Sequence, residues 1–146
     1  MKIALASDHR GYHLKQELIE ALKEKCEILD LGTNSEESVD FPEFGILVGE
    51  TVKNKDADLG IAICGTGIGI SIAANKVKGV MCAKIDNLND AVFAKHHNNA
   101  NVLAFSANKT KEEALEMINA FLETTYNSEE KYQRRIDEIK EYENEH

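Results

Sequence analysis

Cysteine, proline and tryptophan are scarce in this sequence of 146 residues, which has three cysteines, one proline and no tryptophan. Cys26, Cys64 and Cys82 are odd in number and widely spaced, a pattern that suits neither a disulfide framework nor a zinc site. No apolar run approaches the length of a membrane span, and the apolar stretch near the first residue is too short for a signal peptide. We therefore expect a cytoplasmic protein in a reducing compartment, with no membrane association.

Positive charge is also in short supply. Lysine and arginine number 17 against 26 aspartates and glutamates, which gives a formal net charge of −9. This acidity argues against nucleic acid as a partner, because phosphate backbones require a basic surface. Only Arg10, Arg134 and Arg135 are arginines, whose fork of donors suits a phosphate group. For the last two, pairing with nearby glutamates on a solvated helix is the simpler interpretation.

Short apolar runs alternate with segments of helical periodicity along the chain. The runs are continuously apolar, as strands are when helices cover both faces of their sheet. Strands are predicted at 2–7, 27–32, 59–64, 79–85 and 101–107, and helices at 14–25, 43–54, 68–76, 88–98, 111–126 and 129–143. This order predicts an α/β fold in a single domain, 1–146. It is a doubly wound, Rossmann-like sheet of five parallel strands, with helices on both faces and an extra C-terminal helix.

The C-terminal helix, within residues 129–146, carries its apolar residues on a narrow stripe of Tyr132, Ile136, Ile139 and Tyr142. A five-stranded domain leaves little surface for a further helix to cover. We therefore expect this helix either to pack on a partner subunit or to lie on the surface of its own domain.

The segment AICGTGIGISIAANK, residues 62–76, places a cysteine between a predicted strand and a loop rich in glycine. Gly65, Gly67 and Gly69 allow backbone N–H groups to converge on an anion, and the N-terminus of the following helix adds a partial positive charge. The same surroundings favour a thiolate, so Cys64 is a candidate base or nucleophile. The alternative is a buried cysteine at a strand end, which is our interpretation of the other two cysteines.

A nucleotide-binding loop is the competing interpretation of these glycines. The dinucleotide fingerprint G-x-G-x-x-G needs a glycine at position 70, where this chain has Ile70, and it normally follows the first strand. The phosphate-binding loop of nucleotide hydrolases is absent as well. Asp86 does follow the next predicted strand, where a ribose-binding acid would stand. A nucleotide-binding regulatory module therefore stays open as an alternative function.

Histidines and an aspartate supply the remaining candidate site residues. Asp8 and His9 directly follow the first predicted strand, where they can bind hydroxyls or a phosphate, or form a structural pair. His9 and His13 have no third ligand at a recognisable spacing, so we expect no metal site. His96 and His97 are adjacent, so a helix points them in different directions. From sequence alone they lie at the opposite edge of the sheet from the glycine loop.

Four segments follow one another along the chain, SDHRGYHLK, LGTNSEESVDFPEFG, ICGTGIGISIAANK and HHNNANVLAF. Together they resemble the ribose-5-phosphate isomerase B family, which includes isomerases of allose 6-phosphate and, more distantly, galactose 6-phosphate. The resemblance runs from residue 2 to about residue 140. It implies an aldose–ketose isomerase that interconverts ribose 5-phosphate and ribulose 5-phosphate through an enediolate, without metal or organic cofactor. A six-carbon sugar phosphate stays open as the substrate, because one extra carbon is a matter of pocket shape.

The resemblance also implies roles for the residues around Cys64. This thiolate would move the proton between C1 and C2 of the sugar. Thr66 and the backbone N–H groups of the loop would stabilise the enediolate oxygen. The loop residues concerned are Gly65, Gly67, Ile68 and Gly69. A thiolate beside an oxyanion-binding loop suits proton transfer next to a carbonyl group.

For the rest of the sugar, the resemblance implies that His97 assists opening of the furanose ring, that Asn98 binds the sugar and that Asp8 holds its hydroxyls. It also implies a homo-oligomer, a dimer or a tetramer, in which two subunits share each site. His97 then need not reach the site of its own chain, and the C-terminal helix has a neighbouring subunit to contact.

At the phosphate, the resemblance implies His9 together with Lys131 and Arg135 of the C-terminal helix. All three groups can present positive charge or a hydrogen-bond donor to an anion. The expected ligand is therefore a small sugar phosphate held by a local pocket of an acidic protein.

Three positions depart from the family pattern. Arginine is usual at the positions of Lys131 and Asn108, and tyrosine at the position of Phe41. Lysine keeps the charge but loses the bidentate fork. We expect a weaker phosphate contact, or one shaped for another sugar phosphate, with Arg10 or Arg134 as possible compensation. A catalytically inactive sugar-phosphate binder is a further alternative, against which the joint retention of the catalytic residues argues.

Overall fold

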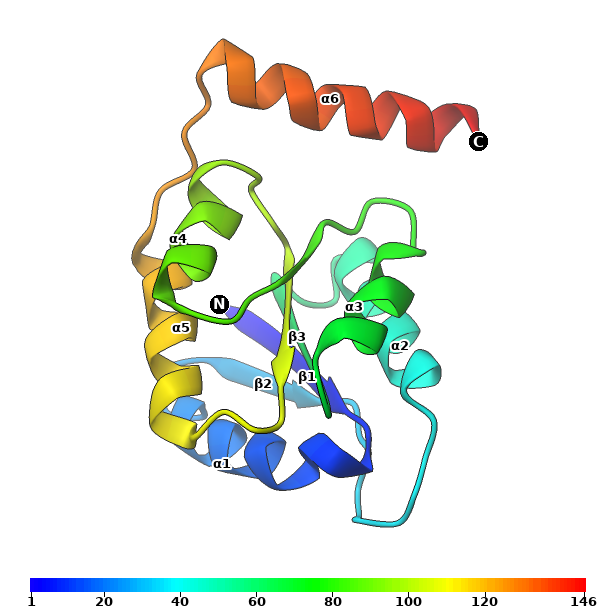
Figure 1. Ribbon diagram of the computed structural model, residues 1–146, viewed down its shortest axis with the longest axis vertical. Helices are drawn as coiled ribbons and strands as arrows, with labels where there is room; N and C mark the ends of the chain where they lie inside the picture. Colours follow the sequence, from blue (N-terminus) through cyan, green and yellow to red (C-terminus); the bar gives the residue numbers. More distant parts are fainter.

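A parallel sheet of five strands runs through the centre of the computed structural model, which describes residues 1–146 (Figure 1). The strands are β1 (Lys2–Ser7), β2 (Glu27–Asp30), β3 (Leu59–Cys64), β4 (Cys82–Lys84) and β5 (Val102–Ser106). They are ordered β2-β1-β3-β5-β4, and every neighbouring pair is parallel. The prediction of an α/β fold with a doubly wound sheet of five parallel strands is confirmed.

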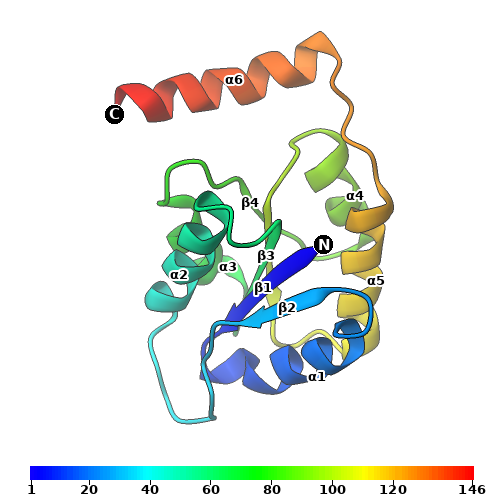
Figure 2. The ribbon, with the colours of Figure 1, turned by 180° about the vertical axis from the view of Figure 1, so that it is seen from behind.

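Helices cover both faces of this sheet, as Figures 1 and 2 show from opposite sides. They are the short 3₁₀-helix η1 (His9–Gly11) and the α-helices α1 (Tyr12–Leu22), α2 (Phe41–Lys53), α3 (Ile68–Asn75), α4 (Leu88–His96), α5 (Lys111–Glu123) and α6 (Glu130–Glu145). α2 and α3 pack on one face, and α1, α4 and α5 pack on the other. All six predicted helices are present, although α1 and α5 end three residues before their predicted ends.

The two edge strands are shorter than the sequence predicts. β2 ends at 30 rather than at 32, and β4 covers 82–84 rather than 79–85. An edge strand has one neighbour, and β4 pairs only with the first three residues of β5. Val80 and Ile85, on either side of β4, are nevertheless buried. The apolar run that predicted a longer strand therefore reflects burial rather than strand pairing.

The two faces of the sheet differ in the size of their side chains. On β3, Ile61 and Ile63 belong to the core under α1, α4 and α5, whereas Ala62 belongs to the core under α2 and α3. Gly45 of α2 allows a close approach to α3, because a Cβ there would lie 2.7 Å from the carbonyl oxygen of Ile70. This tight packing fixes α3 and therefore the loop that leads into it from β3.

α6 lies apart from these layers, beyond the N-terminal ends of the strands (Figures 1 and 2). Ile136 is buried against its own chain, whereas Ile139 and Tyr142 of the same stripe are exposed. At the far end of α6, the Gly79 N–H donates a hydrogen bond to Glu143 Oε1 at 2.8 Å. None of the helices combines the length and the apolar character that crossing a membrane requires.

Candidate active site

A cavity of about 340 Å³ lies at the C-terminal ends of β1 and β3. From β1 the chain continues to one side of the sheet and from β3 to the other, so the strand order reverses here. Doubly wound sheets bind their ligands at such a point. The cavity is lined by Asp8, His9, Arg10, Val39, Asp40, Phe41, Cys64, Gly65, Thr66 and Gly69. The structure thus places one group of the predicted site residues around a single cavity.

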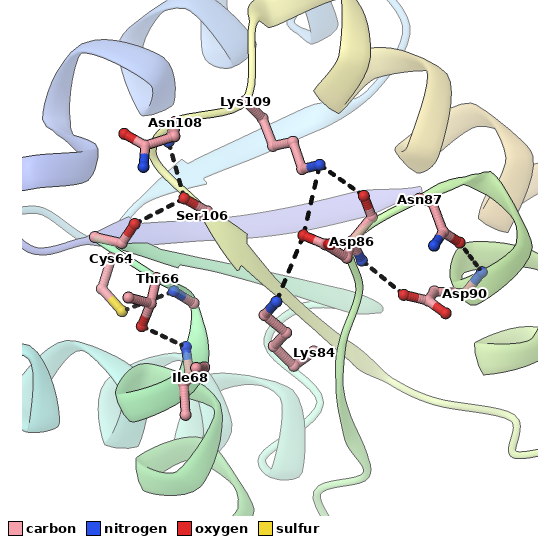
Figure 3. Close-up of polar contacts among 12 residues, drawn as sticks. Cys64, Thr66, Ile68, Lys84, Asp86, Asn87, Asp90, Ser106, Asn108 and Lys109 are labelled. Atoms are coloured by element: carbon pink, nitrogen blue, oxygen red, sulfur yellow. Dashed lines mark hydrogen bonds and ion pairs between the residues drawn. The ribbon is translucent and has the colours of Figure 1, made fainter.

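Cys64 ends β3, and the glycine loop holds its thiol (Figure 3). The thiol-bearing residue is only 4% exposed, and the backbone N–H of Gly67 donates to Cys64 Sγ at 3.2 Å. Gly67 has a φ of 81°, and a Cβ there would lie 2.6 Å from the carbonyl carbon of Phe105, so only glycine fits. A backbone donor and the N-terminus of α3 are both groups that stabilise a thiolate.

Further hydrogen bonds fix the rest of this loop (Figure 3). The Ile68 N–H donates to Thr66 Oγ1 at 3.1 Å, which leaves the threonine hydroxyl hydrogen available to a ligand. Ser106 Oγ, at the end of β5, donates to the Gly65 carbonyl at 2.7 Å and accepts from the Asn108 N–H at 3.0 Å. Ser106 therefore positions the loop, a role that sequence reasoning missed. Its place at the end of a predicted strand was the available signal.

Asp8 and His9 are each tied to the backbone rather than to each other. Asp8 Oδ1 accepts hydrogen bonds from the N–H groups of Arg10 at 2.9 Å and Gly11 at 3.1 Å, which caps η1. His9 Nδ1 lies 3.2 Å from both the backbone N and the backbone O of Val39, in the loop before α2. The alternative of a structural pair between Asp8 and His9 is thus wrong, and both side chains border the cavity.

Arg10 brings a guanidinium to the cavity. Its Nε lies 3.5 Å from the point where a Cβ on Gly65 would stand, so the side chain packs over the glycine loop. The guanidinium forms no ion pair with the chain, whereas Arg134 donates to Glu130 at 2.8 Å on the exposed face of α6. Of the two arginines considered as compensation at the phosphate, only Arg10 reaches this cavity.

Phe41 closes the cavity beside the first turn of α3. A Cβ on Gly69 would lie 2.6 Å from Phe41 Cζ, so the aromatic ring packs directly on the backbone of the loop. A glycine at position 69 is what allows this contact. The ring offers carbon rather than a hydroxyl group to the cavity.

The remaining predicted site residues lie at the N-terminal ends of the strands, on the opposite side of the molecule from the Cys64 cavity. His97 follows α4, Asn98 lines a separate cavity of about 470 Å³, and Lys131 and Arg135 are exposed on α6. In both ribbon views, α6 and the end of α4 stand at one end of the molecule, and η1 and the loop into α2 stand at the other (Figures 1 and 2). Within one chain the structure does not bring these four residues to Cys64.

Asp86, the ribose-binding candidate of the nucleotide alternative, is engaged by two lysines (Figure 3). Its Oδ1 lies 3.5 Å from Lys84 Nζ and 3.5 Å from Lys109 Nζ. The charges of Lys84 and Lys109 hold the pKa of the Asp86 carboxyl below its usual range. Asp86 borders a different cavity, of about 200 Å³, and therefore does not act together with the glycine loop.

The other two cysteines are free and half-buried. Burial raises the pKa of the Cys82 thiol to about 12, which keeps it a neutral thiol near neutral pH. Cys26 packs against the core on the side of α1. Neither borders the cavity around Cys64.

Comparison with known proteins identifies the family. Residues 3–139 match the family model described as Ribose/Galactose Isomerase. The chain belongs to this family. A probable ribose-5-phosphate isomerase B of Mycoplasma genitalium is 45% identical to it over 147 residues, which cover 98% of this chain and 96% of the relative. The resemblance carried by the four sequence segments is thereby confirmed.

Solved structures of ribose/galactose isomerases share the whole fold. The ribose-5-phosphate isomerase B of Clostridium thermocellum is 42% identical, with a TM-score of 0.95 and 99% of each chain covered. The enzyme of Mycoplasma genitalium with bound ribulose-5-phosphate is 44% identical, with a TM-score of 0.92, and the match covers 99% of this chain and 97% of that one. The α6 helix therefore belongs to the fold that these family members share.

Proposed function

We propose that this protein is a sugar-phosphate isomerase that interconverts ribose 5-phosphate and ribulose 5-phosphate. One observation supports it above all: Cys64, a buried thiol at the reversal point of the sheet, accepts a hydrogen bond from the glycine loop that opens α3. An aldose–ketose isomerisation requires a base and oxyanion donors at one place. The family, and the ribulose-5-phosphate bound to its Mycoplasma genitalium member, support this substrate class.

In the proposed reaction, the open-chain sugar lies in the cavity with C1 and C2 beside Cys64 Sγ. The thiolate removes the C2 proton of the aldose, and the C1 carbonyl oxygen takes up the charge, which gives the enediolate. A proton passes from O2 to O1, and the thiol returns its proton to C1, which gives the ketose. The loop N–H groups and the Thr66 hydroxyl stabilise the oxygen charge throughout. The proposed reaction requires no metal and no organic cofactor.

Asp8 and His9 are proposed to bind the sugar from the side of β1. Asp8 Oδ1 already accepts two backbone hydrogen bonds, so Oδ2 is the oxygen available to sugar hydroxyls. His9 is fastened through Nδ1 to the backbone of Val39, so Nε2 is the nitrogen available to the phosphate. Both residues are thus positioned by backbone contacts before any ligand arrives.

The site is proposed to be completed by a second copy of the chain, in a dimer or tetramer. The four predicted residues at the far edge of the sheet can reach a Cys64 cavity only if it belongs to another subunit. Ile68 and Ile72 support a partner on α3, because they lie one turn apart beside the glycine loop and are 54% and 56% exposed. Contiguous exposed apolar side chains of this kind mark contact surfaces. There the partner would supply His97 for ring opening, Asn98 for the sugar, and Lys131 and Arg135 for the phosphate.

The proposed compartment is the cytoplasm. All three cysteines are free. An enzyme that uses a thiolate as its base needs surroundings that keep this thiol reduced.

The decisive experiment follows the formation of ribulose 5-phosphate from ribose 5-phosphate in EDTA, with the wild type beside Cys64→Ala. We expect turnover that survives EDTA and falls by about 10²- to 10⁴-fold in the variant, because the base is removed. Cys26→Ala is the matched control, since this thiol packs away from the cavity, and its turnover should equal that of the wild type. Equal turnover in the wild type and Cys64→Ala would contradict the assignment of the base.

A wild type without turnover on ribose 5-phosphate would direct the assay to allose 6-phosphate and galactose 6-phosphate. The six-carbon alternative is favoured by Phe41, whose ring occupies the place of the usual tyrosine and brings no hydroxyl to the cavity. Titration with nucleotides tests the alternative of a nucleotide-binding regulatory module, since a sugar-phosphate isomerase should bind none of them.

A further inference from the structure

The imidazole of His97 is stacked on two aromatic rings. Phe93, one turn earlier on α4, has its ring centroid 4.7 Å from that of His97, and the ring planes are 14° apart. Tyr132, from the first turn of α6, has its centroid at 4.8 Å, with planes 9° apart. These are distances and angles of stacked rings. The neighbouring His96 ring is tilted by 56° to His97 and does not take part in this parallel arrangement.

The nitrogens of His97 are free of hydrogen bonds within the chain. His9, His13 and His146 are the histidines whose ring nitrogens have polar partners within the chain. A catalytic histidine is commonly oriented by a hydrogen bond to one ring nitrogen, and that nitrogen then takes no direct part in the reaction. Here the ring is held by its faces instead. Both nitrogens therefore stay available, one to donate a proton and the other to accept one.

Tyr132 is placed by contacts that do not involve His97. The Asn127 N–H donates to the His96 carbonyl at 3.0 Å, which fastens the connector before α6 to the end of α4. Ile136, one turn after Tyr132, is buried at 4% exposure. The Tyr126 hydroxyl donates to Gln133 Oε1 at 2.9 Å across the start of α6. The Tyr132 ring is thus presented to His97 by an anchored helix.

The same ring also contacts a phosphate-binding candidate. Lys131 Nζ lies 5.0 Å from the centroid of Tyr132, within the range of a cation–π contact. We propose that Tyr132 is a positioning residue, whose ring orients His97 for ring opening and joins it to the phosphate-binding end of α6. The proposal rests on the proposed function, in which His97 opens the furanose ring and α6 binds the phosphate.

The chemistry of ring opening explains why such a contact matters. A proton must reach the ring oxygen while the anomeric hydroxyl loses its own, so the C1–O4 bond breaks and the C1 carbonyl forms. The imidazole has two rotatable bonds, and a small displacement of its nitrogens from the ring oxygen slows proton transfer steeply. A stack on two faces restricts both rotations. Because Tyr132 belongs to α6, which is proposed to bind the phosphate, the stack also fixes the distance between the bound phosphate and the imidazole that acts on the ring oxygen.

The test compares Tyr132→Leu, which removes the ring, with Tyr132→Phe, which keeps it. Phe93→Leu removes the other ring and leaves α6 untouched, and His97→Ala reports the loss of the imidazole. Two reactions are followed. One is the conversion of ribose 5-phosphate, which needs ring opening. The other is exchange of the C1 hydrogen of ribulose 5-phosphate with D₂O, which needs the Cys64 base but no ring opening, because the C5 oxygen of this ketose carries the phosphate.

We expect Tyr132→Leu and Phe93→Leu to lower kcat for ribose 5-phosphate by about 10- to 100-fold, with KM changed by less than about 3-fold. Hydrogen exchange should stay within about 2-fold of the wild type, since the enolisation machinery lies elsewhere. Tyr132→Phe should match the wild type in both reactions. In NMR spectra, the Cε1–H resonance of His97 should move downfield in Tyr132→Leu and stay in place in Tyr132→Phe, because it loses ring-current shielding only in the former.

The outcomes separate this proposal from the function on which it rests. Unimpaired conversion by Tyr132→Leu, beside an impaired His97→Ala, overturns the positioning role alone. Parallel loss of conversion and exchange in both leucine variants also overturns it, because the rings would then serve the fold. Unimpaired conversion by His97→Ala removes His97 from the proposed mechanism, and loss of exchange in Cys64→Ala still tests the isomerase itself.

Discussion

Cys64 and Arg10 approach one stretch of backbone from two sides. The thiol accepts a hydrogen bond from Gly67, and the guanidinium packs over Gly65, at the other end of the same turn. In a chain with a net charge of −9, the Arg10 guanidinium borders a cavity without an ion pair to an acidic group, so its charge is available to an anion in that cavity. Its place on the loop puts it where the enediolate oxygen is proposed to form.

We therefore predict that Arg10→Ala lowers kcat for ribose 5-phosphate by about 10- to 100-fold, since a charge aimed at a developing oxyanion acts mainly in the transition state. Steady-state kinetics with ribose 5-phosphate and with ribulose 5-phosphate measure this change in kcat. Arg134→Ala is the matched control, because this arginine is paired with Glu130 on the exposed face of α6, and its kinetics should not change. An unchanged kcat with a raised KM, and weaker inhibition by inorganic phosphate, would instead place Arg10 on the phosphate.

Among the secondary-structure elements, β4 depends most on its surroundings. It has three residues and one neighbour. Lys84 ends this strand, Asp86 follows it, and Lys109 follows β5, so their ion pairs join the two loops at the C-terminal edge (Figure 3). Lys109 Nζ also donates to the Asp86 carbonyl at 2.6 Å. These side-chain ion pairs thus help to hold a strand that backbone pairing joins to β5 at only three residues.

This cluster predicts a pH dependence of stability. The lysines hold the folded-state pKa of Asp86 below the ordinary value of 3.8. Ionised Asp86 therefore stabilises the fold above that pH, and its contribution is lost as the pH falls through the lowered folded-state pKa. The melting temperature of Asp86→Asn should lie slightly below that of the wild type at pH 7, and the gap should close in acid. Asp56→Asn, at an exposed position outside the ion pairs, should show no such closing gap.

A gap that persists unchanged into acid would mean that the Asp86 carboxylate does not carry the effect. High salt offers an independent check, because exposed ion pairs are screened by it, and the gap at pH 7 should narrow in 1 M salt, where the Debye length is only about 3 Å.

Prediction from sequence succeeds best where a secondary-structure element and the residues proposed to contact the ligand are contiguous in the chain. β3, the glycine loop and α3 follow one another in the chain, so the apolar run, the glycines and the helical period locate Cys64 without any knowledge of distant packing. The cover of both sheet faces follows from the alternation of elements for the same reason. The length of β4 could not be predicted, because burial of Val80 and Ile85 resembles strand pairing in sequence.

Contacts between distant segments are what the sequence does not predict. The stack of His97 on Tyr132 depends on where α6 crosses the end of α4, and that is set by the connector before α6 and by the burial of Ile136. The hydrogen bond from Ser106 to Gly65 depends on β5 lying between β3 and β4, against the order of the strands in the chain. Ser106 stands at the end of a predicted strand, which was the only signal for its role, and no local pattern marks Tyr132 as a contact of His97.

For the whole molecule, the central fact is that the predicted site residues divide between opposite edges of one sheet. The group around Cys64 borders the cavity at the C-terminal edge, and the group around His97 stands with α6 at the other. A rigid parallel sheet separates the two groups, so no movement of a loop can unite them. In the proposed oligomer each group is one half of a site, and two chains related by a twofold axis would form two complete sites.

This arrangement predicts complementation between two inactive variants. Cys64→Ala and His97→Ala should each lose conversion of ribose 5-phosphate when purified alone. In a mixed dimer, one site carries both substitutions, and the other receives an intact Cys64 from one chain and an intact His97 from its partner. Random pairing makes half of the dimers mixed, so co-expressed variants should recover about a quarter of wild-type activity. Differently tagged chains, purified through both tags in turn, should recover about half. Activity no higher than that of the parents, from verified mixed dimers, would mean that each site is built within one chain.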